Sequence, residues 1–384
     1  MEQWKEYRLE DFIHFNPTIS LKKGTVARKI AMDNLIPHSR KIYSWSIEPY
    51  SGGAKFQNGD TIMARITPCL ENGKHSYVSI LDEGEIAYGS TEYIVMRGIN
   101  GISNNLFIYY LSQYSKFKNA AVKSMVGSSG RQRAQVDVLK NLAFNLPGLT
   151  EQKRIADFLS SLDDKIELNR QINDNLEQQA QALFKSWFVD FEPFKDGEFV
   201  DSELGMIPKG WKIGTLGDIA DVSSGKRPPM KQSEMTPDIN IPLIGASSVM
   251  GFTNEVLYNK AILVIGRVGT HGIVQRFNTP CWPSDNTLVI ETTFYEYVNQ
   301  ILRVIDYKSL NRGSTQPLIT QTDLKNQMVL IPNEKVLCDY NEIASKAMIK
   351  FDFNLSEINH LVTIRDTLLP RLMSGELKIN EINC

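Results

Sequence analysis

The sequence is poor in the residues that build metal centres and disulfide frameworks. Four of its 384 residues are cysteines and five are histidines, and neither type is clustered. The cysteines form no C-x-x-C pair, and the histidines lack the spacing of metal ligands. We therefore predict no metal site and only reduced, incidental thiols. The cysteines are Cys69, Cys281, Cys338 and Cys384.

Long apolar runs are also missing. The opening residues, MEQWKEYRLEDF, lack the basic region and apolar run of a signal peptide, and no stretch approaches the length of a membrane span. Hydrophobic residues make up 42% of the chain and charged residues 22%, as in folded globular proteins. We expect a cytoplasmic protein without membrane contact, and the length favours two or more domains.

A basic excess, which most isolated DNA-binding proteins show, is absent from the chain as a whole. The net charge is −2, but its distribution is uneven. Residues 1–148 hold 18 Lys/Arg and 13 Asp/Glu, whereas residues 149–200 hold 6 and 11. Residues 201–332 hold 12 of each, and residues 333–384 hold 6 and 8. If DNA is bound, a partner is expected to neutralise many of its phosphates.

Sequence motifs of catalysis are not found. The segment GKR at 225–227 lacks the spacing and the Ser/Thr of a phosphate-binding loop, and FEPF at 191–194 lacks the Asn and second Pro of an adenine methyltransferase motif. A metal-dependent nuclease built on Asp366, Glu376 and Lys378 is an alternative. Its acidic-x-Lys pattern is short and common, so we predict no catalytic residues.

An internal repeat is present instead. The segment QWKEYRLEDF at 3–12 returns as GWKIGTLGDI at 210–219, at an offset of 207 residues. An apolar β-branched run ends at Arg65 in the first half and at Arg267 in the second, each before a turn-rich segment. The recurring residues are Trp4, Lys5, Leu9 and Asp11, which match Trp211, Lys212, Leu216 and Asp218.

The order of later elements repeats as well. Strand-like YIVM at 93–96 and TLVI at 287–290 precede helical patterns at about 104–124 and 294–308. A Gly-Ser turn and a DVLKN or DLKN segment follow in each half, and from Leu139 and Leu324 onward the offset is 185. We therefore predict two related strand-rich domains, 1–148 and 196–332, of similar order and different surface.

Two long amphipathic helices follow these domains, within residues 149–195 and 333–384. Their 3-4 apolar spacing, interrupted by Asn169 and Asn173, predicts an antiparallel coiled coil in an α+β protein with approximate two-fold symmetry. Packing of each helix onto its own domain is the alternative. Pro370 should loosen the last turn. The predicted coil or interface residues are Leu159, Leu162, Ile166, Leu176, Leu183, Trp187, Phe351, Leu355, Ile358, Leu368 and Leu372.

Residues that could read DNA are expected on the turns beside rigid strands. Arg, Lys, Asn and Gln there can reach base edges, and glycines in GSSGRQR and GSTQP permit tight turns. Lys226 and Arg227 are expected to meet phosphate. The complete set is Arg65, Lys74, Arg131, Gln132, Arg133, Lys226, Arg227, Arg267, His271, Gln275, Arg312, Ser314 and Gln316.

The chain resembles the DNA-specificity subunits of Type I restriction-modification systems. NRQINDNLEQQAQALFKSWFVDFEPF at 169–194 is similar to their central region, and TIRDTLLPRLMSGEL at 363–377 to their C-terminal region. GMIPKGWKIGTLGDI at 205–219 is similar to the entry of their second target-recognition domain. The resemblance covers the whole chain in order, and the LFKSWF and LLPRLMSGEL stretches are specific signals.

The resemblance implies a non-catalytic subunit in which each domain reads one half of a bipartite target in double-stranded DNA. It implies that the coil sets the spacer and docks two adenine methyltransferase subunits and, in some systems, two translocating nuclease subunits. No cofactor is expected on this chain, because S-adenosylmethionine, and ATP with Mg²⁺, would belong to those partners. A coiled-coil tether is the other alternative, although a tether needs no repeated domains with arginine-tipped turns.

Overall fold

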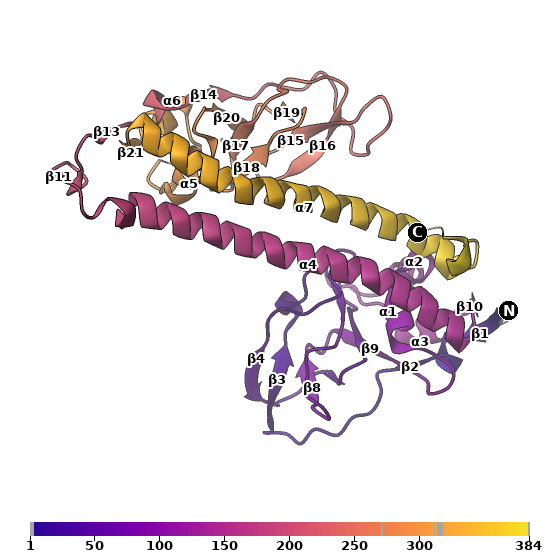
Figure 1. Ribbon diagram of the computed structural model, residues 1–384. Helices are drawn as coiled ribbons and strands as arrows, with labels where there is room; N and C mark the ends of the chain where they lie inside the picture. Colours follow the sequence, from indigo (N-terminus) through magenta and orange to yellow (C-terminus); the bar gives the residue numbers. More distant parts are fainter. Residues whose placement is uncertain (1–3, 270–271, 311, 313–317, 383–384) are drawn as a thin grey trace. The chain divides into compact units, whose positions relative to one another are not determined.

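The computed structural model describes residues 4–269, 272–310, 312 and 318–382. The chain forms two compact units, residues 1–170 with 355–384 and residues 171–354. Each contains a strand-rich part, called domain 1 in the first unit and domain 2 in the second, together with segments of the two long helices (Figure 1). Within the described ranges, no helix is both long and apolar enough to cross a membrane.

Domain 1 contains two four-stranded sheets and a separate strand pair. One sheet has the order β2-β9-β6-β7 and is antiparallel, and the other has the order β4-β3-β8-β5 with β3 and β8 parallel. The pair β1-β10 joins the two ends of the domain. The strands are β1 Lys5–Arg8, β2 Ile13–Phe15, β3 Val26–Ile30, β4 Ser46–Pro49, β5 Lys55–Phe56, β6 Thr61–Ala64, β7 His75–Tyr77, β8 Ala87–Gly89, β9 Tyr93–Gly98 and β10 Ala143–Leu146.

Domain 2 repeats most of this topology, without a counterpart of β5 and with an added pair β11-β12. Its sheet β14-β20-β17-β18 matches β2-β9-β6-β7, β16-β15-β19 matches β4-β3-β8, and the pair β13-β21 matches β1-β10. The parallel pair recurs too, as β15 with β19. The strands are β11 Phe199–Val200, β12 Ile207–Pro208, β13 Lys212–Thr215, β14 Asp221–Ser224, β15 Ile241–Ile244, β16 Val249–Thr253, β17 Ile262–Gly266, β18 Gln275–Phe277, β19 Trp282–Pro283, β20 Thr287–Glu291 and β21 Met328–Ile331.

The first sheet of each domain is covered on both faces, which explains its continuous apolar runs. Alternate residues of a strand point to opposite faces. Met63 of β6 and Ile94 of β9 belong to the core under the helices, whereas Ile62 and Val95 belong to the core shared with the second sheet. In domain 2, Leu263 and Val264 of β17 divide in the same way. The repeat predicted from the sequence is confirmed at the level of packing.

The short helices differ from the prediction in extent. The expected helix at 104–124 is two helices, α1 Asn105–Gln113 and α2 Ser115–Lys123, because Tyr114 has an extended ψ of 131°. Asn104 caps α1 by accepting a hydrogen bond from the Phe107 amide. In domain 2, α5 covers Tyr295–Val304 and is shorter than expected. α3 Val136–Lys140 and α6 Gln321–Lys325 occupy equivalent places before β10 and β21.

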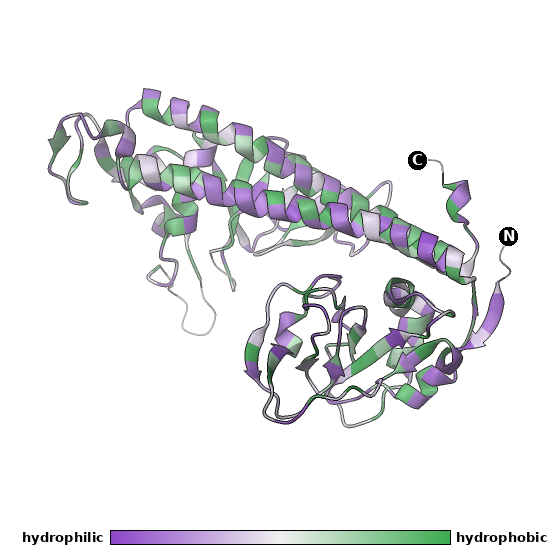
Figure 2. Cartoon of the chain, turned by 60° about the horizontal axis from the view of Figure 1, so that its bottom comes forward, coloured by the Kyte–Doolittle hydropathy of each residue, from purple (hydrophilic) through white to green (hydrophobic). Residues whose placement is uncertain are grey.

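The two long helices are α4, Leu149–Phe188, and α7, Glu334–Ser374. In the first unit Asp163 pairs with Arg365 and Asn169 with Glu357; in the second, Asn173 meets Phe351 and Phe188 meets Tyr340. Rising numbers on α4 meet falling numbers on α7, so the predicted antiparallel pairing is confirmed in each unit. Figure 2 shows apolar and polar residues interspersed along both helices.

Helix-to-domain packing, the alternative arrangement, occurs as well. Leu159 and Leu372 lie in the core of domain 1, and Phe184 and Phe188 lie in the core of domain 2. α7 continues through Pro370 and ends at Ser374, before Gly375 with its positive φ. Each helix therefore serves both as a partner for the other helix and as a wall of a domain core.

His75, the first residue of β7, is buried and lies with its ring 5.6 Å from that of Tyr109. Burial lowers the pKa of His75 to about 4 from 6.5. The unfolded chain therefore takes up a proton at a higher pH than the folded protein does. Above about pH 6.5, His75 is neutral in both states and does not lower the free energy of unfolding. As the pH drops towards 4, that free energy falls, by about 2 kcal/mol at pH 5.

We expect His75→Phe to abolish this acid-dependent loss, because phenylalanine keeps the ring contact and does not titrate. Urea unfolding at pH 7 and pH 5 measures the difference. His14→Phe, on the exposed face of β2, should leave the wild-type pH dependence intact. A His75→Phe protein that loses as much stability as the wild type between these pH values would contradict the assignment.

Candidate nucleic-acid interface

The two predicted arginines, Arg65 and Arg267, occupy equivalent positions. Each directly follows an inner strand of its sheet, β6 or β17. The Arg65 amide donates to the Glu92 carbonyl at 2.9 Å, and the Arg267 amide donates to the Asn286 carbonyl at 2.9 Å. The Arg65 carbonyl accepts from Ala134 at 2.8 Å, as that of Arg267 does from Ile319 at 3.0 Å.

The turn at 127–133 lies directly beside Arg65 in domain 1. Thr67 donates its amide to the Gln132 carbonyl at 3.0 Å, and Arg133 forms an isolated bridge with Ile66. Gly127 has φ +139°, and a Cβ there would lie 2.8 Å from the Arg131 carbonyl oxygen, so the turn requires glycine. The structure thus brings the GSSGRQR segment and Arg65 into one site.

Glu92, just before β9, completes this site and was missed by the sequence reasoning. Arg133 donates to it from Nε at 2.9 and 3.0 Å and from Nη2 at 2.6 Å. Hydrogen bonding to Glu92, followed by its negative charge, raises the pKa of the exposed Arg133 guanidinium. Arg131 beside them is exposed. The site therefore presents a fixed carboxylate–guanidinium pair at the surface.

Two of the predicted DNA-reading residues in domain 1 make hydrogen bonds within the domain. Arg65 Nη2 donates to the Ala134 carbonyl at 3.0 Å, and its buried Nε has no hydrogen-bond partner among the described residues. Lys74 Nζ donates to the Met32 carbonyl at 2.9 Å and lies 3.5 Å from Asp33. Lys74 therefore holds the turn at 32–34, a role that competes with DNA contact.

In domain 2, Arg227 lines a surface groove of about 480 Å³ that Asp285 and Asn286 also line. Lys226 and Arg227 are both exposed, and their contact with phosphate stays a prediction. Because Arg267 is bonded to Asn286 through the main chain, the groove adjoins the position equivalent to the domain 1 site. Met230 and Met250 give the groove an apolar wall.

The other domain 2 candidates are only partly available. Gln275 Nε2 donates to the Gly245 carbonyl at 2.9 Å, so its amide is used within the domain. Arg312 is exposed and forms an ion pair with Asp323. His271, Ser314 and Gln316 lie outside the described residues.

The predicted coil residues are largely internal, with one exception. Leu355 is 46% exposed, and the neighbouring Asn354 is the buried residue. Leu355 therefore does not pack inside the coil, because an asparagine pair occupies that level, and its place in a subunit interface stays a prediction. Leu159, Ile166, Ile358 and Leu372 are buried, and Leu162, Leu176, Leu183, Trp187, Phe351 and Leu368 are partly buried.

Buried polar residues hold the helices in register, which the sequence indicated only as interruptions of the apolar pattern. Asn173 donates to the Phe351 carbonyl at 3.1 Å and accepts from Asn354 at 2.9 Å. Asn169 donates to Glu357 at 2.7 Å. A shifted register would leave these amides unsatisfied in the contact, at about 1–3 kcal/mol for each lost partner. The asparagines therefore specify one alignment within each unit.

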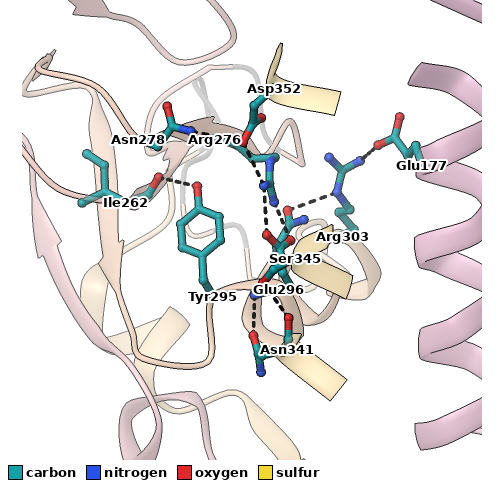
Figure 3. Close-up of polar contacts among 11 residues, drawn as sticks. Glu177, Ile262, Arg276, Asn278, Tyr295, Glu296, Arg303, Asn341, Ser345 and Asp352 are labelled. Carbon is teal, nitrogen blue, oxygen red and sulfur yellow. Dashed lines mark hydrogen bonds and ion pairs between the residues drawn. The ribbon is translucent and has the colours of Figure 1, made fainter. Parts of the chain in front are cut away.

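A buried ion pair also stabilises the contacts of the long helices in each unit. In the second unit Arg276 of β18 donates to Glu296 of α5 at 2.6 and 3.0 Å and lies 3.4 Å from Asp352 of α7 (Figure 3). Arg303 of α5 pairs with Glu177 of α4. In the first unit Arg365 of α7 pairs with Asp163 of α4, so this buried pair joins the two helices. The Tyr110 hydroxyl of α1 links domain 1 to them by donating to Asp163 at 2.6 Å. These pairs were not predicted, because sequence spacing does not reveal them.

Comparison with known proteins matches nearly the whole chain to one family. Residues 1–178 and 208–360 match the family of the Type I restriction modification DNA specificity domain. The chain is 30% identical over 305 residues to the Type I restriction enzyme MjaIX specificity subunit of Methanocaldococcus jannaschii, covering 72% of this chain and 70% of that protein. It is 24% identical to the HindI specificity subunit of Haemophilus influenzae, covering 98% and 100% of the two chains.

A solved structure shares the fold. The Type I restriction-modification S subunit from M. genitalium matches with a TM-score of 0.57 and 17% identity, over 97% of this chain and 96% of that one. Fold and site together define an α+β protein with two related strand-rich domains, each packed against a pair of antiparallel helices. The chain belongs to the Type I restriction modification DNA specificity family, as the resemblance predicted.

Proposed function

We propose that this chain is a non-catalytic, cytoplasmic specificity subunit in which each domain reads one half of an asymmetric, bipartite DNA target. One observation carries the proposal: the two domains share a strand order but differ in sequence at equivalent segments. Domain 1 has Arg131, Gln132 and Arg133 in its turn, whereas domain 2 has STQPLI at 314–319 in the equivalent segment. Two domains of the same fold that carry different DNA-reading residues suit two different half-sites.

The paired helices are proposed to set the spacer between the half-sites. A spacing between two DNA-reading modules is fixed only when the connector is stiff. The buried asparagines and ion pairs support stiffness, since they oppose sliding of α4 along α7. At a rise of 1.5 Å per residue, the 40 residues of α4 extend over roughly 60 Å. We propose that the helix pair determines the length of the spacer.

The helices are also proposed to dock two adenine methyltransferase subunits and, where the system has them, two translocating nuclease subunits. The net charge of −2 supports a role for partners in DNA affinity, because the chain has too little positive charge to neutralise a long stretch of DNA. S-adenosylmethionine, and ATP with Mg²⁺, would be bound by those partners. Native mass measurement of the purified complex should show one copy of this chain with two methyltransferases.

Mapping of methylated adenines tests the proposed function. DNA from cells that carry this chain with its methyltransferase should show a target of two different half-sites separated by a spacer of fixed length. Cells with the methyltransferase but without this chain provide the control and should lack the modification. A perfect palindrome, or an unchanged methylation pattern in the control, would contradict the proposal. A structural tether predicts no sequence dependence at all.

A further inference from the structure

Main-chain hydrogen bonds align two further pairs of residues in the two domains. Because Arg65 and Arg267 bond to Glu92 and Asn286 through the main chain, Glu92 and Asn286 occupy the same position of the fold. The bridges that follow, Ile66 with Arg133 and Val268 with Leu318, make Arg133 and Leu318 equivalent in the same way. Sequence identity does not indicate either pair.

The chemistry at these equivalent positions is different. In domain 1 the Glu92 carboxylate is held by three hydrogen bonds from Arg133, with side chains 23% and 44% exposed. In domain 2 the position of Arg133 is taken by the apolar Leu318, and Asn286 is exposed. The side-chain amide of Asn286 makes no hydrogen bond with another described residue, and only its main-chain carbonyl is used, by Arg267. One domain thus offers a charged pair and the other a free amide.

These groups fit different base pairs in the major groove. A guanidinium donates to O6 and N7 of guanine, and a carboxylate accepts from the N4 amino group of cytosine. An Arg–Glu pair can therefore address both bases of one C·G pair. A carboxylate alone would be repelled by the phosphates, and Arg133 removes that repulsion by neutralising Glu92. An asparagine amide instead suits N6 and N7 of adenine.

We propose that Glu92 and Arg133 together select a C·G base pair in the half-site read by domain 1, and that Asn286 selects an adenine in the half-site read by domain 2. This inference rests on the proposed function, since it assigns the bases read by a protein already taken to bind a bipartite target. It adds Glu92 and Asn286 to the residues that determine specificity.

A selection from randomised duplexes tests the inference, using this chain in complex with its methyltransferase subunits. The wild-type complex should prefer C·G at one position of one half-site by about 5- to 150-fold. Glu92→Gln should abolish this preference and leave the other half-site unchanged. Asn286→Ala should abolish a preference for adenine in the other half-site only. Glu83→Gln, an equal charge change at an exposed residue of domain 1, is the control and should alter neither.

Arg133→Lys provides a second variant in case Glu92→Gln unfolds domain 1. It keeps the charge but loses the planar fork, so it should relax the same C·G position. Unchanged preferences in these variants, changes in the same half-site for domain 1 and domain 2 variants, or a uniform loss of affinity would each overturn the inference. So would a wild-type preference other than C·G at the affected position. A wild-type complex that selects no bipartite sequence would instead refute the proposed function itself.

Discussion

Replacing Arg365 by alanine is expected to destabilise the first unit by about 3–5 kcal/mol, the typical cost of leaving a buried charge without its partner. Arg365 of α7 donates to Asp163 of α4 at 2.7 Å, and the two side chains are only 8% and 7% exposed. Asp163 also accepts from the Tyr110 hydroxyl at 2.6 Å. Burial, and then the charge of Asp163, raises the pKa of Tyr110, so this hydroxyl remains a donor. Loss of Arg365 would remove the ion-pair partner of the buried Asp163, and only the more distant charge of Arg40 would partly compensate.

Hydrogen exchange of the α1 amides measures this effect, because it reports the opening of one unit without requiring the whole chain to unfold in a single step. Arg371→Ala provides a matched control on the same helix. Arg371 forms an exposed ion pair with Glu376, which typically contributes 0–1 kcal/mol, so α1 protection should barely change. Equal protection losses in the two variants would show that the buried pair contributes nothing beyond a surface pair.

The architecture was largely predictable because periodicity and repetition report burial directly. The apolar runs before Arg65 and Arg267 become β6 and β17, since a strand covered on both faces needs apolar residues at every position. The long 3-4 patterns become α4 and α7. The break at Tyr114 was not predictable, because no proline or glycine marks it and only the local ψ angle ends α1.

The residues that fix the helix register were visible in the sequence but were interpreted only in part. Asn169 and Asn173 interrupt the apolar stripe, and the structure buries both. Their meaning depends on Asn354 and Glu357, which lie more than 180 residues away on the other helix and become partners only after pairing. For the same reason Leu355, which fits the apolar spacing, lies outside the contact.

The candidate site shows the same limit. Arg65 and Arg267 were found because they end matching apolar runs, and the turn at 127–133 because its glycines stand out. Glu92 and Asn286 carry no such signal, since a polar residue before a strand is an ordinary feature of turns. Only the pairing of β6 with β9 and of β17 with β20 places each beside its arginine. Their place in the candidate site follows from strand register, which amino-acid composition does not reveal.

Lengthening both helices by one turn is expected to lengthen the DNA spacer without changing the bases read. The insertions are four helix-forming residues after Arg170 in α4 and four after Asn354 in α7, at the boundary between the two units. Contacts of Asp163 with Arg365 remain on one side of the insertions, and contacts of Asn173 with Asn354 remain on the other. Each helix grows by roughly 6 Å, so about two base pairs should be added at 3.4 Å per pair. Methylome mapping measures both the spacer and the half-sites.

Insertion of two residues at the same places distinguishes the effect of helix length from the effect of helix rotation. Four residues turn a helix by about 400°, which leaves the apolar face displaced by only about 40°, whereas two residues turn it by about 200°. The two-residue protein should therefore lose helix pairing and fold poorly, which circular dichroism would show as a lower melting temperature. Inserting four residues in α4 alone should also fail, because α7 would then be too short to keep both sets of contacts. New half-site bases with an unaltered spacer, in the protein with four-residue insertions, would show that the helix pair does not determine the spacer length.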